Sequence, residues 1–197
     1  MTVQRPAISM GQLLAYMMIF IVVPIITYVT GMRIDLLLSL PAFPPFPVNL
    51  LFGFTVFYVG LKMGIKSTKL LYNRGLGLPW GEARKDVETS KLVVTGPYAY
   101  TRNPMILGYS LLPCGMGLMF RSIGMSTTIP FVVVLINVAL VKIKEESHLE
   151  ERFGKEYLDY KRSTPFLIPK LGNITRLIVE SIKSEPRGET SHNGEAP

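Results

Sequence analysis

The sequence has few of the side chains that bind metals or form disulfides. Its 197 residues include one cysteine, Cys114, and two histidines, His148 and His192. A single cysteine excludes an intramolecular disulfide and a cysteine-based metal cluster. No combination of these residues gives the usual zinc ligand set. We therefore predict no metal site.

Common nucleotide-binding and hydrolase motifs are missing as well. The chain contains no Walker loop, no G-x-G-x-x-G fingerprint and no G-x-S-x-G elbow. Its net charge of +7 would suit nucleic acid, but the basic residues flank apolar runs and mix with acids. Membrane topology explains this basic excess better, so we expect no nucleic-acid partner.

Charged residues are concentrated in two parts of the chain. Of 35 charged residues, all but four lie within 62–102 and 142–197. The rest of the chain contains uncharged runs of 27, 26, 18 and 20 residues, at 6–32, 36–61, 103–120 and 122–141. A helix needs about 20 largely apolar residues to cross the bilayer core. The sequence therefore predicts an all-α integral membrane protein.

We predict four transmembrane helices, at about Met10–Thr30, Phe46–Lys66, Pro104–Phe120 and Thr127–Ile143. A fifth, re-entrant helix stays open, within 41–47 or 67–95. Nineteen Lys and Arg residues lie on one side of these spans against two on the other. This asymmetry places both termini in the cytoplasm. We expect a single membrane domain over 1–183 and a disordered tail over 184–197.

Beyond the fourth span the pattern becomes amphipathic. Leu149, Phe153, Tyr157 and Tyr160 recur at helical spacing, which predicts a cytoplasmic amphipathic helix. Gly154 interrupts this helix, and prolines at 165 and 169 end it. Residues 173–183 predict a second, short interfacial helix.

Two cytoplasmic clusters are candidates for a binding site. In the first, Asn103 and Pro104 fit the N-cap and first position of the third span, with Tyr98 and Arg102 just before them. A helix N-terminus beside an arginine can hold an anionic group such as a carboxylate. The second cluster is Glu145-Glu146, which fits either a solvated helix start or a carboxylate that holds a ligand ammonium group.

The two clusters, in this order, resemble the isoprenylcysteine carboxyl methyltransferase family and its phospholipid methyltransferase relatives. The resemblance covers about residues 90–170. It rests on Gly96-Pro97-Tyr98, Arg102-Asn103-Pro104, Gly108, Glu145-Glu146, Phe153-Gly154, Tyr157, Tyr160, Arg162 and Pro165. These families are integral membrane enzymes that use S-adenosylmethionine.

The resemblance implies a cofactor pocket between the start of the third span and the Glu-Glu helix. Glu145 would bind the methionyl ammonium group, supported by Glu146. Tyr98 and Arg102 are added on proximity and chemistry. The other positions implied to contact the cofactor are Asn103, Pro104, Met105, Ile106, Leu111, Met116, Gly117, Leu118 and Met119.

The chain also departs from the family pattern. Asn103 stands where the better-known members have histidine, and Ile106 replaces the usual tyrosine. Val141 falls where the eukaryotic enzymes place an arginine for the substrate carboxylate. We therefore do not expect a prenylcysteine carboxylate as the substrate.

The function expected from the resemblance is S-adenosylmethionine-dependent methyl transfer to a lipophilic small molecule or lipid-linked acceptor. Because such a transfer depends mostly on positioning, no catalytic side chain is assigned. Two alternatives stay open. One is a membrane NADPH-dependent reductase of the sterol-reductase kind, and the other is a non-catalytic membrane interaction protein.

Overall fold

The computed structural model describes residues 10–75, 91–142 and 146–183, with side chains from Ile21 onward in the first range. Within these ranges the chain is helical and contains no strand, so the all-α class is confirmed. Trp80, Glu145 and the predicted tail lie outside the described residues. The helices in chain order are α1 (Met10–Leu37), α2 (Val48–Leu70), η1 (Leu71–Gly75), η3 (Gly96–Ala99), α3 (Pro104–Met119), η4 (Gly124–Thr128), α4 (Ile129–Leu140), α5 (Glu146–Ser163), η6 (Leu171–Asn173) and α6 (Ile174–Ile182).

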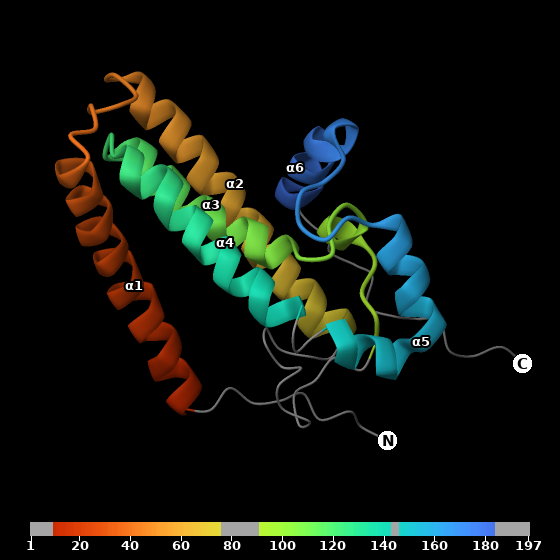
Figure 1. Ribbon diagram of the computed structural model, residues 1–197. Coiled ribbons are helices and arrows are strands. Elements are labelled where there is room, and N and C mark those ends of the chain that lie inside the picture. The colour runs from red at the N-terminus through yellow and green to blue at the C-terminus, as the bar shows by residue number, and fades with distance from the viewer. Residues whose placement is uncertain (1–9, 76–90, 143–145, 184–197) are drawn as a thin grey trace, which may run out of the picture.

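Helices α2, α3 and α4 form a bundle, with α3 packed against both of the others, and α1 packs mainly on η4 (Figure 1). The connections between α1 and α2 and between α3 and α4 lie at one end of this bundle. Helices α5 and α6 and the short turn η3 lie at the other end, beside the start of α3. Segments far apart in the sequence therefore meet where α3 begins.

Glycines bring α2 and α3 into backbone contact. A Cβ atom added at Gly108 would lie 2.8 Å from the backbone nitrogen of Gly64, and one added at Gly115 would lie 2.6 Å from that of Phe57. Such distances leave no room for a side chain, so both positions require glycine. On α2, Gly60 and Gly64 provide the close helix packing that their G-x-x-x-G spacing predicts.

Polar contacts hold together the end of the bundle that carries the α1–α2 and α3–α4 connections. The Asp35 carboxylate of α1 accepts a hydrogen bond from the backbone nitrogen of Gly124 at 2.6 Å. The Arg121 side chain donates to the carbonyl oxygens of Pro44 and Ala42 at 3.0 and 3.2 Å. Residues 41–47 form turns and no helix, because the prolines there lack the N–H that a helix needs. The re-entrant alternative for 41–47 is therefore wrong.

One helix of the described chain, Val48–Gly75, is long and apolar enough to cross a membrane. The α3 helix and the helix Gly124–Leu140 are apolar but shorter. At 1.5 Å per residue, the 16 residues of α3 span about 24 Å, less than the roughly 30 Å of a bilayer core. By length and composition the structure thus supports one of the four or five expected spans.

Large apolar side chains nevertheless cover the outer faces of three helices. Ile25 on α1, Phe54 on α2 and Phe131 on α4 are 58%, 60% and 67% exposed. Contiguous exposed apolar surface marks contact with lipid or another protein. The single strong amide of α4, Asn137, donates to the Val133 carbonyl oxygen of its own helix at 2.8 Å. One of its two N–H groups is therefore satisfied within its own helix.

The two helices predicted beyond the fourth span are both present. The apolar stripe falls on α5, which bends at Gly154, where φ is 50° and ψ is −123°. The helix ends at Ser163, before Pro165. The short interfacial helix predicted over 173–183 is α6, which packs against α2 and η3.

We expect Gly115→Ala to destabilise the protein, because its Cβ would clash with the backbone of α2. Overpacking of this kind costs about 1–3 kcal/mol, so the melting temperature in detergent should fall. Gly172→Ala is the matched control, since a Cβ there meets no atom within 4 Å. Equal melting temperatures for the two variants would contradict the proposed backbone contact between α2 and α3.

Candidate functional site

The segment just before α3 is held by the chain that follows α5. The fully buried Thr101 hydroxyl donates to the Leu167 carbonyl oxygen at 2.8 Å. The backbone nitrogen of Arg102 donates to the carbonyl oxygen of Pro165 at 2.9 Å. The Asn103 side-chain amide donates to the Phe166 carbonyl oxygen at 2.9 Å. Two of the motifs that carry the family resemblance are thus joined in space.

Asn103 occupies the predicted N-cap position, and Pro104 begins α3. The Asn103 side chain, however, makes no capping hydrogen bond to the helix. Its amide is instead engaged by Phe166. The predicted start of α3 is therefore confirmed. The Asn103 side chain, however, binds the Phe166 backbone and does not cap the helix.

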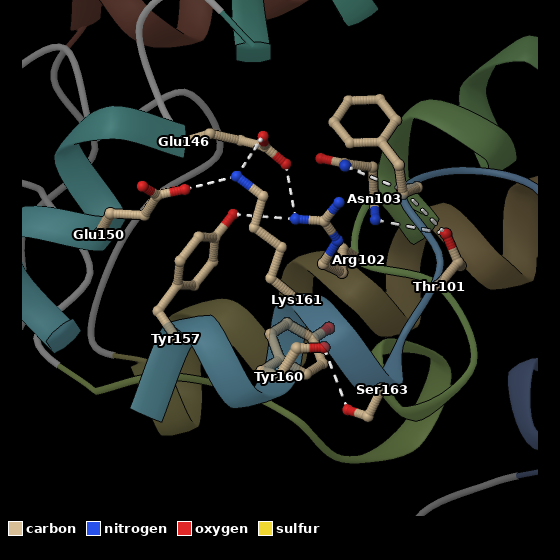
Figure 2. A network of polar contacts seen from close by, with 10 residues as sticks. Thr101, Arg102, Asn103, Glu146, Glu150, Tyr157, Tyr160, Lys161 and Ser163 are labelled. Carbon is tan, nitrogen blue, oxygen red and sulfur yellow. Dashed lines mark hydrogen bonds and ion pairs between the residues drawn. The ribbon is translucent and has the colours of Figure 1, made fainter. Parts of the chain in front are cut away.

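A carboxylate between two cations forms the centre of the site (Figure 2). Glu146, the first residue of α5, contacts Arg102 Nη1 through Oε1 at 2.6 Å and Lys161 Nζ through Oε2 at 3.2 Å. Lys161 also pairs with Glu150. The side chains of Arg102 and Glu146 are only 10% and 12% exposed. Two cations and two anions therefore balance in this cluster, of which Arg102 and Glu146 form the buried part and Lys161 and Glu150 the more exposed part.

The bend at Gly154 makes this cluster geometrically feasible. Glu146 and Lys161 are 15 residues apart, which corresponds to about 22 Å along a straight helix. Their charged atoms are nevertheless 3.2 Å apart, because α5 folds back on itself at this residue. A positive φ with this ψ is accessible mainly to glycine.

Arg102 retains an unused hydrogen-bond donor. Its Nη1 contacts Glu146 and the Tyr157 hydroxyl, the latter at 3.4 Å, and its guanidinium carbon lies 5.4 Å from the centre of the Phe166 ring. Its Nε is buried and has no hydrogen-bond partner among the described residues. A buried donor without a partner is costly, so this atom is able to donate to a further polar or anionic group.

Three tyrosines lie near the charged cluster, and each has a different environment. The Tyr160 hydroxyl donates to the Tyr98 carbonyl oxygen at 2.7 Å. Burial raises the pKa of Tyr157, and the nearby Glu146 carboxylate raises it further. The predicted site residue Tyr98 lies in an apolar cluster with Leu70 and Val93. Its ring therefore packs in the core, and its main chain supports Tyr160.

The predicted cofactor positions divide between the two ends of α3. Pro104 and Ile106 are buried near the start, where the Met105 sulfur accepts a hydrogen bond from Thr68 at 3.4 Å. Leu111 packs on Gly60 halfway along the helix. The remaining predicted positions, Met116, Gly117, Leu118 and Met119, lie in the last turn of α3.

That last turn is remote from the charged cluster. Met116 is 12 residues beyond Pro104, about 18 Å along the helix axis. Met119 packs on Gly53 of α2, and Gly117 packs on Ser126. The structure therefore brings together Arg102, Asn103, Pro104 and Glu146, and does not bring 116–119 to them. Glu145 lies outside the described residues.

Sequence reasoning missed Lys161, Glu150, Thr101 and Phe166. The resemblance pointed to Arg162 as the basic residue of its closing motif, but that side chain is 80% exposed and faces Asp159 at 3.6 Å. The cation that pairs with Glu146 is the preceding residue, Lys161. The helical repeat gave a usable signal, because Tyr157 and Lys161 are four residues apart and share a face. No comparable signal marks Phe166.

Within the described ranges, no group of three or more His, Cys, Asp or Glu side chains gathers as a metal site would require. The side chains present suit an ionic organic ligand instead. A carboxylate on the ligand would match Arg102 and the start of α3. An ammonium group would match an acidic side chain.

Comparison with known proteins identifies the class. The described chain is a helical bundle with a charged cluster at one end. The profile of the phospholipid methyltransferase family matches residues 48–156, more than half of the chain, and the protein belongs to this family of membrane methyltransferases. The match runs from the start of α2 into α5 and includes Arg102 and Glu146. It confirms the resemblance seen in the sequence.

The chain is also similar to a curated protein, the nickel-cobalt-cadmium resistance protein NccN of Alcaligenes xylosoxydans xylosoxydans. The two are 33% identical over 84 residues, which are 43% of this chain and 38% of that protein. The chain thus spans well under half the length of this relative. No solved structure matches the chain significantly.

The Tyr160 hydroxyl is expected to resist ionisation in the folded protein. Burial raises the pKa of Tyr160 above its ordinary value, which is about 10. The neutral phenol therefore contributes stability below about pH 10, and this contribution is lost as the pH rises further. Absorbance at 295 nm of wild type minus Tyr160→Phe should stay flat through pH 10. A normal tyrosine titration in that difference would contradict the buried hydrogen bond to Tyr98.

Proposed function

We propose that this protein is an S-adenosylmethionine-dependent membrane methyltransferase whose acceptor is a lipophilic small molecule or a lipid-linked group. The observation that carries the proposal is the family match over residues 48–156. The matched range contains the buried pair of Arg102 and Glu146. Family membership favours this function over an NADPH-dependent reductase and over a non-catalytic interaction protein.

The side chains at the start of α3 suit the amino-acid end of the cofactor, which carries a carboxylate and an ammonium group. The unpartnered Nε of Arg102 would donate to the carboxylate. Glu145 would accept from the ammonium group. Glu146 is already bound by Arg102 and Lys161, so its proposed role is to hold the Arg102 guanidinium in place.

The bound cofactor would supply an electrophilic methyl group on a sulfonium. The protein's own contribution is to fix the cofactor, exclude water and align an acceptor. Asn103 and Phe166 would keep the start of α3 fixed relative to α5. We assign no general base, in keeping with a transfer driven by positioning.

We propose that α1, α2, α3 and α4 all cross the membrane, within one domain over 1–183 whose cofactor-binding part is 90–170. The exposed apolar side chains on α1, α2 and α4 support this arrangement. The excess of Lys and Arg at the end that carries α5 and α6 supports a cytoplasmic location for that end and for both termini. A lipophilic acceptor would then enter from the bilayer, and the cofactor from the cytoplasm.

Arg102→Gln should weaken binding of S-adenosylhomocysteine to the detergent-purified protein by about 10- to 100-fold. A charge-assisted hydrogen bond contributes about 1.5–3 kcal/mol. Arg162→Gln is the matched control, since that exposed arginine lies outside the cluster. Isothermal titration calorimetry would measure both affinities, with NADPH as the second ligand. Binding of NADPH alone to folded wild type would refute the methyltransferase assignment.

Glu145→Gln should also lower the affinity for S-adenosylhomocysteine, because the amide cannot neutralise the methionyl ammonium group. The exposed Glu156 provides the control, as Glu156→Gln. Circular dichroism and gel filtration would establish that each variant is folded. Unchanged affinity in folded Glu145→Gln would remove Glu145 from the site.

A further inference from the structure

A single lysine on α2 anchors helix α6. Lys66 Nζ donates to the Glu180 carboxylate at 2.9 Å, to the Lys183 carbonyl oxygen at 3.1 Å and to the Glu180 carbonyl oxygen. The Lys66 side chain is 12% exposed. An ammonium group beside the last carbonyl groups of a helix stabilises that end. The C-terminus of α6 is therefore fastened to the side of α2.

The position of Lys66 sets the level of α6 relative to a bilayer. Lys66 lies 18 residues beyond Val48, the first residue of α2, or about 27 Å along the helix. This is close to the thickness of the hydrocarbon core, about 30 Å. The neighbouring Ile65 is still 44% exposed and apolar. If α2 crosses the membrane as proposed above, the end of α6 that Lys66 holds lies near the boundary between hydrocarbon and headgroups.

Apolar side chains project from α6 and the turn before it. Ile168, Leu171 and Val179 are 75%, 86% and 58% exposed. The inward side of the helix is occupied, since Leu177 and Ser181 are each 2% exposed. These three side chains are therefore mostly uncovered by the described protein, on the segment whose C-terminal end Lys66 holds.

The same segment is basic. Lys170, Arg176 and Lys183 are exposed. The only acid between 164 and 183 is Glu180, and its carboxylate is bound by Lys66. Exposed apolar residues among uncompensated cations are typical of segments that lie in the interface of anionic membranes.

We propose that residues 168–183 form an interfacial anchor that binds anionic phospholipid headgroups. The apolar side chains of Ile168, Leu171 and Val179 enter the boundary between headgroups and acyl chains. Lys170, Arg176 and Lys183 contact the lipid phosphates. This surface is separate from the Arg102–Glu146 cluster, and its occupant is the membrane in which the protein resides.

A fluorescent probe at Leu171 would test the anchor in the full chain. In a Cys114→Ala background, Leu171→Cys would carry bimane, and the protein would be placed in nanodiscs with or without phosphatidylglycerol in phosphatidylcholine. We expect blue-shifted emission that brominated lipid quenches, with a larger shift in the anionic discs. The same probe at Lys155→Cys, an exposed position on α5, should report water. Water-like emission at 171 in both discs would overturn the anchor.

A pair of triple variants tests whether the three exposed cations of the anchor bind anionic headgroups. Lys170→Gln, Arg176→Gln and Lys183→Gln together should abolish the difference between the two discs. A second triple variant at exposed positions elsewhere, Lys91→Gln, Lys155→Gln and Arg162→Gln, should keep it. An equal response in both triple variants would overturn the assignment to anionic headgroups.

A probe at Phe54→Cys separates the anchor from the proposed topology. Phe54 is exposed near the middle of α2, so brominated lipid should quench it strongly if α2 crosses the bilayer. Quenching at 54 without quenching at 171 would overturn the anchor alone. No quenching at 54 would overturn both the crossing by α2 and the anchor.

Discussion

The close approach of α2 and α3 is the constraint on which the rest of the structure depends. Gly60 and Gly64 on one helix meet Gly108 on the other with no space for a side chain. This contact fixes where α3 begins, and therefore where Arg102 lies. It also fixes α2 beside α3, so that Lys66 can hold α6 at the same end of the bundle. In lipid, where the hydrophobic effect does not drive helices together, such backbone proximity is the main source of packing energy.

The charged cluster pairs a buried arginine with opposite charge at the end of this bundle. Burying an arginine without a partner is costly, and Glu146, Lys161 and Glu150 form with it a group of two cations and two anions. The charges cancel without using every hydrogen-bond donor, since Arg102 Nε has no acceptor in the part of the chain that the structure describes. A site of this kind can take up a small zwitterion while its own charges stay paired.

The sequence predicted the helices well where a local pattern defines them. Uncharged runs located α2, α3 and α4, the pair Asn103-Pro104 marked the start of α3, and the four-residue spacing of apolar side chains marked α5. The contacts that build the site were harder to predict. Lys161 reaches Glu146 only after a backbone reversal, and Asn103 binds a carbonyl group 63 residues away. Neither contact produces a periodic pattern in the sequence, because the first depends on the bend of α5 at Gly154 and the second on how the segment after α5 packs against the start of α3.

The backbone at Gly154 has a consequence for the order in which the site can form. Glu146, Glu150 and Lys161 all belong to α5, so their mutual ion pairs require only the reversal at that residue. This half of the cluster is a local unit that can assemble before it meets Arg102. A side chain at 154 would touch no other atom, yet it would oppose the reversal through its own φ and ψ alone. The residue that the cluster needs most is thus one that makes no contact with it.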